Sequence, residues 1–500
     1  MKTRWIASPV ERVRTDLLVI GLYTTRRRSP LYKALQSMFG PALRGILEGE
    51  RFRFKPGDTA VIHGLGQLRA RQVLLAALGR PGRVKPDDLR TMAGGAARRA
   101  RRGGLTRVAF AVDPAFADGN KGLDDASARA LMEGACLGGY RFDRYLDEDS
   151  RDPESLIEVG LVAPGRRGRD RLLAAMERGR IAAEATMLAR DLVNEPPNVA
   201  SPEHMRTRAE QLADELGLAI QVLERDELER RGMGCLLAVG QGSAQPTYLI
   251  HLTYTPEVEA RSRVALVGKC LTFDSGGLCI KTAAGMLEMK SDMGGSAAVL
   301  GTLAGAARLE LPLEIHAIFA ATENMTGAAA YRAGDVLTAS NGKTVEVINT
   351  DAEGRLTLAD ALVYSSALEP DVTLELATLT GACVVALGKQ YTGMFTPSDR
   401  LARQLTRAGD SSGDRMWRLP LADEYKSLIK GTISDLKNTG GRWAGAITAG
   451  LFLQEFVTQP SRWVHLDIAG PSFTDKDKGY RTKGGTGAPV RALLEFLETL

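Results

Sequence analysis

The chain of 500 residues is long enough for two to four domains, because one hydrophobic core rarely serves more than about 250–300 residues. A composition of 44% hydrophobic and 25% charged residues is typical of a soluble globular protein and excludes a wholly disordered chain. No apolar run approaches the roughly 20 residues that span a bilayer. The five cysteines and five histidines form no spaced disulfide or metal-binding motif, so we expect a cytoplasmic protein without membrane contacts.

The front of the chain is basic. Residues 1–150 contain 27 Lys and Arg against 16 Asp and Glu, a net charge of +11, and the remainder contains 38 against 44. Strand-like runs at 17–23, 59–62 and 107–112, together with a helical pattern at 126–137, predict a small α/β domain over residues 1–165. A Pro and an Arg-Gly run at 164–169 predict a linker, so that 166–198 is expected to be a linker with a connecting helix, and 199–500 a second, larger domain.

From about residue 248, strand-like and helical segments alternate. The strand-like runs lie at 264–267, 313–320, 345–348, 373–376 and 464–468. Strands separated by helices predict a mostly parallel sheet that helices cover on both faces. The expected fold is therefore α/β, with a smaller N-terminal α/β domain and a larger C-terminal domain around a mostly parallel, helix-covered sheet.

Four carboxylates follow these predicted strands. Asp274 comes after the run at 264–267, Asp292 opens the next helix, and Asp351 and Glu353 come after the run at 345–348. Because ligands of parallel sheets bind at the carboxyl ends of the strands, we expect the four side chains to meet at one edge of one sheet. Lys269, Lys281 and Arg355 are interleaved with them in the sequence.

Four clustered carboxylates repel one another unless cations neutralise them. Two divalent cations would balance the charge, and ligands of this type suit Mn, Mg or Zn. A pair of metals can generate hydroxide at neutral pH. An isolated Asp-x-Glu is more often a solvated surface or a helix cap, and a Lys near an Asp is usually a surface ion pair; the recurrence in three successive loops favours a metal site.

Three strings then identify a family. Thr-Phe-Asp-Ser-Gly-Gly (272–277), Met-Lys-Ser-Asp-Met-Gly-Gly (289–295) and Asn-Thr-Asp-Ala-Glu-Gly-Arg-Leu (349–356) closely resemble the leucyl aminopeptidase family, and the likeness covers essentially all of 186–500. The resemblance implies a metal-dependent aminopeptidase that removes a Leu-like N-terminal residue from short peptides through a hydroxide bridged by two metals, Mn or Zn. It also implies a homohexamer whose active sites face an interior cavity.

The resemblance also implies a role for each residue. One metal would be bound by Lys269, Asp274, Asp292 and Glu353, and the other by Asp274, Asp351 and Glu353. Lys281 and Arg355 would be the catalytic residues that bind no metal, with a bicarbonate held at Arg355. Met289, Thr378 and Ala469 would line the pocket for the first side chain of the substrate.

Two other functions stay open. The basic clusters at 26–28 and 98–102 could contact phosphates, which would suit a DNA-binding accessory protein in recombination or transcription. Carboxylates that bind two metals also serve phosphoryl hydrolysis. The paired lysines and the string at 349–356 favour the peptidase.

Overall fold

The computed structural model describes the chain except for residues 25–28, 65–67, 113–122, 152–155 and 164–167, so most of the expected linker and the first arginine cluster lie outside the described residues. The described residues form two compact units. Unit 1 comprises Met1–Glu184 and Lys476–Thr482, and unit 2 comprises Ala185–Asp475 and Lys483–Leu500. No helix in the described residues is both long and apolar enough to cross a membrane.

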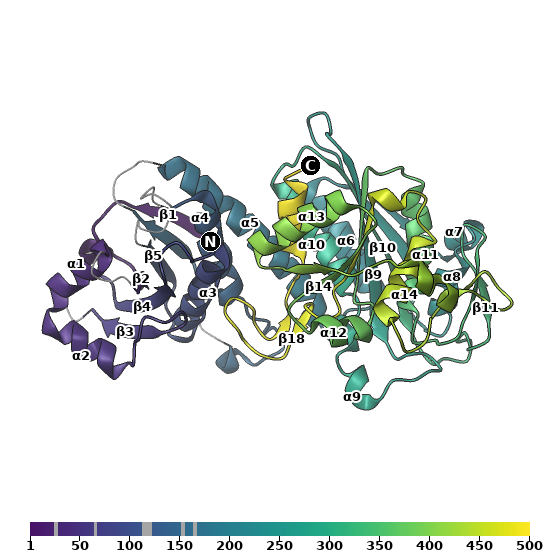
Figure 1. Cartoon of the computed structure of the whole chain (residues 1–500), viewed down its shortest axis with the longest axis horizontal. Coiled ribbons are helices and arrows are strands. Elements are labelled where there is room, and N and C mark those ends of the chain that lie inside the picture. Colours follow the sequence, from purple (N-terminus) through teal and green to yellow (C-terminus); the bar gives the residue numbers. More distant parts are fainter. Residues whose placement is uncertain (25–28, 65–67, 113–122, 152–155, 164–167) are drawn as a thin grey trace. The chain divides into compact units, whose positions relative to one another are not determined.

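Unit 1 contains a six-stranded sheet in the order β1-β6-β5-β2-β4-β3 (Figure 1). Every neighbouring pair is parallel except β3 with β4. The strands are β1 (Lys2–Ile6), β2 (Leu17–Tyr23), β3 (Thr59–His63), β4 (Gln72–Gly79), β5 (Arg107–Val112) and β6 (Glu158–Val162). The helices are α1 (Pro30–Phe39), α2 (Pro41–Gly49), α3 (Pro86–Arg102) and α4 (Asp125–Gly139), with short 3-10 turns at Val10–Arg12 and Glu148–Ser150. The α/β character expected for this part of the chain is confirmed.

Unit 2 is built on an eight-stranded sheet in the order β15-β14-β17-β13-β9-β10-β8-β7. Its central strands β17, β13, β9 and β10 are parallel, whereas β8, β7 and β14 each run antiparallel to a neighbour. The strands are β7 (Ala219–Leu223), β8 (Tyr248–Tyr254), β9 (Arg263–Asp274), β10 (Glu314–Asn324), β13 (Val372–Ala377), β14 (Thr392–Phe395), β15 (Met416–Arg418) and β17 (Trp463–Asp467). The central strands are almost wholly buried, as expected for a sheet that is covered on both faces.

Helices cover both faces of this sheet. In Figure 1, α10 and α13 lie on one side of β9 and β10, and α11, α14 and α8 lie on the other. Helix α5 (Arg169–Asn194) belongs to unit 1 as far as Glu184 and to unit 2 from Ala185. The other helices of unit 2 that begin before residue 300 are α6 (Pro202–Leu216), α7 (Arg225–Arg230), α8 (Gly234–Gly240), α9 (Ala283–Met286) and α10 (Gly294–Arg308). The later helices are α11 (Gly354–Ser366), α12 (Gly381–Leu387), α13 (Asp399–Ser412), α14 (Gly445–Gln454) and α15 (Val490–Leu497). Short 3-10 turns lie at Met289–Ser291, Asp423–Ile429 and Pro460–Arg462.

Two smaller sheets complete unit 2. One joins β11 (Val336–Thr338), β12 (Thr344–Glu346) and β16 (Leu436–Lys437), and the other pairs β18 (Phe473–Thr474) with β19 (Gly484–Gly485). The run at 345–348 therefore belongs to a separate three-stranded sheet, so the expectation that it is a strand of the main sheet is wrong. The residues of β12 pair with β11 on one side and with β16 on the other. Asp351 and Glu353 lie beyond β12, and Glu353 directly precedes α11.

Candidate metal centre

Lys269 and Asp274 lie on β9, at the centre of the main sheet. The strand extends seven residues beyond the predicted run, as far as Asp274, because its residues pair with β10 up to that point. The Lys269 side chain is only 3% exposed and runs past the start of α11. A Cβ on Gly354 would lie 2.3 Å from Cε of Lys269, so only glycine lets this lysine pass.

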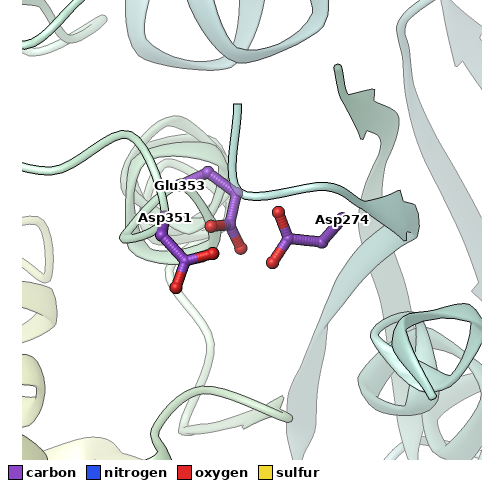
Figure 2. Close-up of side chains that lie close together, drawn as sticks. All are labelled: Asp274, Asp351 and Glu353. Carbon is purple, nitrogen blue, oxygen red and sulfur yellow. The ribbon is translucent and has the colours of Figure 1, made fainter. Parts of the chain in front are cut away.

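Three carboxylates converge beside the end of β9. Side-chain oxygens of Asp274, Asp351 and Glu353 all lie within 4.8 Å of one another (Figure 2). Asp274 is the last residue of β9, Asp351 lies in the loop before α11, and Glu353 is the residue directly before α11. The structure thus brings these carboxylates together although they do not come from one sheet.

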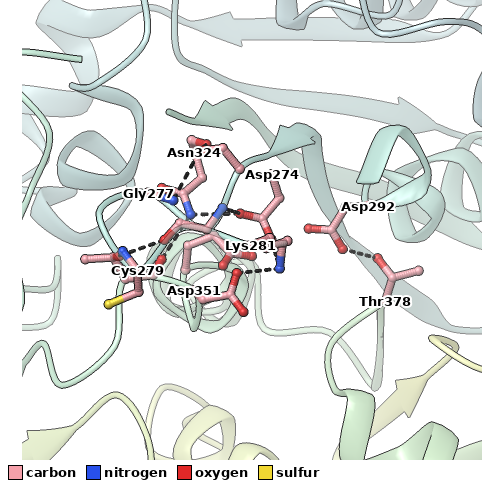
Figure 3. Close-up of polar contacts among 12 residues, drawn as sticks. Asp274, Gly277, Cys279, Lys281, Asp292, Asn324, Asp351 and Thr378 are labelled. Atoms are coloured by element: carbon pink, nitrogen blue, oxygen red, sulfur yellow. Dashed lines mark hydrogen bonds and ion pairs between the residues drawn. The ribbon is translucent and has the colours of Figure 1, made fainter. Parts of the chain in front are cut away.

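Asp292 joins this group through Lys269. The Lys269 Nζ lies 2.6 Å from Oδ2 of Asp292 and 2.9 Å from Oε1 of Glu353. On its other side, Asp292 accepts a hydrogen bond of 2.8 Å from the Thr378 hydroxyl, which follows β13 (Figure 3). Lys281 is the second cation: its Nζ lies 2.8 Å from Oδ2 of Asp274 and also pairs with Asp351.

The electrostatics of the cluster are those of a buried acidic site. Burial and the neighbouring Asp274 raise the pKa of Glu353, and burial raises the pKa of Asp292 against the opposing effect of Lys269. Burial alone would lower the pKa of Lys269, but the surrounding carboxylates outweigh burial and raise it. Two lysines face four carboxylates, so the ionised cluster keeps an excess of negative charge, which is the condition for binding cations.

The donors fit divalent metal ions. Oε2 of Glu353 is buried without a hydrogen-bond partner in the described part of the chain. The clustered oxygens belong to carboxylates, with no thiolate or imidazole among them, which suits hard or borderline divalent cations such as Mn. An uncompensated buried carboxylate oxygen costs free energy, and a bound cation would remove that cost.

Arg355 lies on the first turn of α11 and is 7% exposed. Its Nε and Nη1 atoms are buried and have no hydrogen-bond partner among the described residues. Burial lowers the pKa of the guanidinium to about 10, against the raising effect of Glu353 and Asp467, so it stays protonated at neutral pH. A buried cation with free N–H groups can hold an oxyanion in bidentate fashion.

A cavity of about 520 Å³ opens onto the cluster. Besides the predicted metal ligands, Lys281 and Arg355, it is lined by all three residues that the sequence places in a substrate pocket: Met289, Thr378 and Ala469. Thr378 does more than line a wall, because it also holds Asp292. The lining also includes two exposed cations, Lys389 and Arg442, which did not stand out in the sequence.

Asn324, the last residue of β10, did not stand out in the sequence. It is fully buried and donates hydrogen bonds to Asp274 and to the backbone of the 349–353 loop. The predicted run at 313–320 stops four residues before Asn324. Had the strand been extended, Asn324 would have appeared as a polar residue at the carboxyl end of a parallel strand, which is where ligand-binding residues lie.

The second basic cluster is largely occupied within unit 1. Arg98 donates to the Gly479 carbonyl, and Arg101 donates to the carbonyls of Gly139 and Tyr140. These arginines hold backbone carbonyls in place, so the cluster offers fewer free cations to a phosphate backbone than its sequence implies.

Comparison with known proteins agrees with this site. Residues 187–494 match the catalytic domain of the cytosol aminopeptidase family, and residues 19–149 match its N-terminal domain. A probable cytosol aminopeptidase of Syntrophotalea carbinolica is 44% identical, with 98% of each chain covered. One of Gloeobacter violaceus is 42% identical over 97% of each chain.

Solved structures agree as well. The bottromycin maturation enzyme BotP in complex with Mn has a TM-score of 0.84 at 38% identity, covering 97% of this chain and 99% of that one. A mutant of tomato leucine aminopeptidase has a TM-score of 0.90 at 33% identity, covering 100% and 97%. The relatives named here are aminopeptidases and a maturation enzyme, which favours peptide hydrolysis over DNA binding and phosphoryl transfer. The chain belongs to the cytosol aminopeptidase family, and it is a metal-dependent aminopeptidase.

Proposed function

We propose that this aminopeptidase binds two divalent cations, Mn or Zn, between Lys269, Asp274, Asp292, Asp351 and Glu353. Lys269 would serve as a neutral amine, because an ammonium has no free electron pair. The bound cations would replace the proton that the carboxylates hold on Lys269 in the metal-free protein. The observation that carries the proposal is the convergence of three carboxylates within 4.8 Å in a buried cluster with excess negative charge. Asp274 and Glu353 are central in that cluster and would contact both cations. The relative BotP, solved in complex with Mn, supports Mn as the first metal to test.

When bound, the cations supply Lewis acidity and acidify a water molecule that attacks the peptide. The residues of this chain do the rest. In the metal-free protein Asp274 and Glu353 outweigh burial and raise the pKa of Lys281. Lys281 would stay protonated in the loaded enzyme, and its ammonium would donate to the scissile carbonyl oxygen as negative charge develops there.

Arg355 cannot act as a base, because it keeps its proton. Its buried Nε and Nη1 would hold a bicarbonate ion, which when bound would supply a base beside the attacking water. Asp292 faces the cavity beside Thr378 and would accept a hydrogen bond from the α-amine of the substrate. Binding the free amine there restricts cleavage to the first peptide bond.

The substrates would be short peptides with a Leu-like first residue. Met289 and Ala469 present small or apolar surface to the cavity, and its volume of about 520 Å³ suits a few residues of peptide. Such an apolar pocket distinguishes side chains that differ by one methylene only by about 1–3 kcal/mol. We also propose a homohexamer in the cytoplasm, which rests on the family resemblance.

The test is hydrolysis of Leu-p-nitroanilide by Mn-loaded enzyme, with p-nitrophenyl phosphate as the competing substrate. We expect turnover of the anilide alone, and loss of that turnover on chelation. Lys281→Ala should lower kcat by about 10²–10³-fold with metal content unchanged, the loss typical of one oxyanion donor. Asp274→Ala should instead lose bound metal, and normal metal stoichiometry in this variant would contradict its assignment as a shared ligand.

A further inference from the structure

Asn324 stands opposite Asp274 because of an irregularity in the main sheet. Strands β10 and β9 pair in regular parallel register as far as Thr322 with Leu271, and the register then shifts so that Glu323 faces Phe273 and Asn324 faces Asp274. Thr272 is the extra residue of this bulge. Without the bulge Asn324 would stand opposite Phe273, so the irregularity aligns the amide with the carboxylate.

The Asn324 amide holds Asp274 directly. Its Nδ2 donates to Oδ1 of Asp274 at 2.8 Å, and the backbone N–H of Gly276 donates to the same oxygen at 2.9 Å (Figure 3). Oδ2 of Asp274 faces Lys281 in the cavity instead. The two donors therefore fix the rotation of the carboxylate and direct its other oxygen toward the cluster.

The same residue ties the two ligand-bearing loops together. Its Nδ2 also donates to the Thr350 carbonyl at 3.0 Å, beside Asp351. The backbone carbonyl of Asn324 accepts hydrogen bonds from the backbone N–H and the hydroxyl of Ser275. Gly277 packs so tightly there that a Cβ would lie 2.8 Å from Oδ1 of Asn324, and its φ of +61° is in the left-handed region. Position 277 therefore needs glycine, and Asn324 beside it is fully buried.

We infer that Asn324 is a positioning residue for the metal centre, which orients the Asp274 carboxylate and fixes its distance from the 349–353 loop. The inference rests on the proposed binding of divalent cations. Partners that orient ligands in this way commonly change metal affinity by about 10–100-fold when they are removed. If Asn324 had a purely structural role, its removal would weaken the connection between the two loops without a specific effect on the orientation of Asp274.

Tyr331 provides the matched control. Its hydroxyl donates to the same Thr350 carbonyl at 2.7 Å, and it makes no hydrogen bond to Asp274. Tyr331→Phe therefore removes one tie to the 349–353 loop and leaves the Asp274 contacts in place. Asn324→Ala removes the hydrogen bond to Asp274 and the hydrogen bond to the Thr350 carbonyl. Asn324→Leu removes the same two hydrogen bonds at nearly constant side-chain volume.

The experiment measures Mn affinity by calorimetry on chelator-treated full-length protein, and the visible absorption of Co-loaded protein as a report on ligand geometry. We expect both Asn324 variants to bind Mn about 10–100-fold more weakly than wild type and to shift the Co bands, while Tyr331→Phe stays within about threefold. Melting curves of the metal-free proteins check folding.

Wild-type affinity and spectra in the Asn324 variants would overturn the inference, and so would an equal loss in Tyr331→Phe. Failure of both Asn324 variants to fold would also overturn it, since Asn324 would then be structural. A wild-type protein that binds no Mn would instead refute the proposed function, so the two failures are distinguishable.

Discussion

The metal centre contains residues of both charges, and some of their polar atoms have no hydrogen-bond partner in the described chain. Lys269 and Lys281 each contact two carboxylates, yet Oε2 of Glu353 and two nitrogens of Arg355 have no hydrogen-bond partner in the described chain. Buried polar atoms without partners are rare and costly in folded proteins. Their concentration around one cavity indicates that this region is adapted to bind ions, at the expense of stability.

Arg355 allows a test of this trade between stability and activity. In Arg355→Met, an unbranched apolar side chain replaces a buried cation that has two nitrogens without a hydrogen-bond partner in the described chain. Burial outweighs the attraction of Glu353 and Asp467 and lowers the pKa of Arg355, so the buried charge itself costs free energy in the folded protein. Its removal should therefore not lower the free energy of unfolding. At the same time kcat should drop by at least about 10²-fold, because the proposed anion site is lost.

The measurements are urea denaturation of metal-free protein without added bicarbonate, and steady-state kinetics of the Mn-loaded enzyme. Thr357→Val, a change on the same helix that leaves the guanidinium in place, controls for helix damage. A variant that is clearly less stable than wild type would show that Arg355 has a structural role that the hydrogen bonds do not reveal.

At the scale of elements, the sequence predicts the strands of both units well where they are buried. The run at 107–112 is β5 as predicted, since a continuous apolar segment ends at polar residues. The run at 264–267 is too short, because Lys269, Thr272 and Asp274 read as loop residues. Lys269 can be buried in the strand because it pairs with Asp292 and Glu353. On β10, the Thr322 carbonyl accepts from the Thr272 hydroxyl, and the Asn324 amide donates to Asp274. Such contacts cannot be read from one segment.

The candidate site shows the same limit. Local sequence strings are enough to predict the metal-ligand candidates. They do not predict how these residues are brought together, because the run at 345–348 belongs to another sheet. The alignment of Asn324 with Asp274 depends on a bulge between β9 and β10, whose paired residues are at least 40 residues apart in the chain. No local sequence pattern encodes this bulge. The roles of the individual ligands stay predictions until metal binding is measured.

Strands β8 and β10 carry a histidine pair that predicts a dependence of stability on pH. His251 Nε2 lies 3.0 Å from Nδ1 of His316, and its Nδ1 lies 3.1 Å from the Tyr364 hydroxyl. Burial, with a smaller effect of His316, lowers the pKa of His251 to about 4 from 6.5. The other charged groups here are Glu314, 2.9 Å from Nε2 of His316, and Arg263, which pairs with Glu314.

Because the pKa of His251 is lower in the folded than in the unfolded chain, the unfolded chain binds more protons between pH 6.5 and 4. The stabilisation is complete above pH 6.5 and is lost as the pH falls toward 4, by up to about 3 kcal/mol for this group. Unfolding by urea at several pH values should show a shallower acid loss in His251→Gln. Parallel pH profiles for variant and wild type would contradict the assignment.

At the scale of the whole molecule, every proposed metal ligand lies in unit 2, and unit 1 contributes none. The charge difference between the front and the rest of the chain follows this division in part, because the basic residues are concentrated before residue 150 and the carboxylate cluster comes later. The four carboxylates repel one another in the metal-free protein, so unit 2 should gain stability when metal binds.

This asymmetry predicts the effect of metal on melting. A ligand that binds only the folded state stabilises it by RT ln(1 + [L]/Kd), about 2.7 kcal/mol at 100 times Kd. Scanning calorimetry with increasing Mn should therefore move the transition of unit 2 to higher temperature and leave that of unit 1 in place. Hydrogen exchange of peptides from 263–274 and 349–366, compared with peptides from 86–102, assigns each transition to its unit. Asp274→Ala should abolish the shift, and an equal shift of both transitions in wild type would mean that the cations act outside the carboxylate cluster or that the two units unfold together.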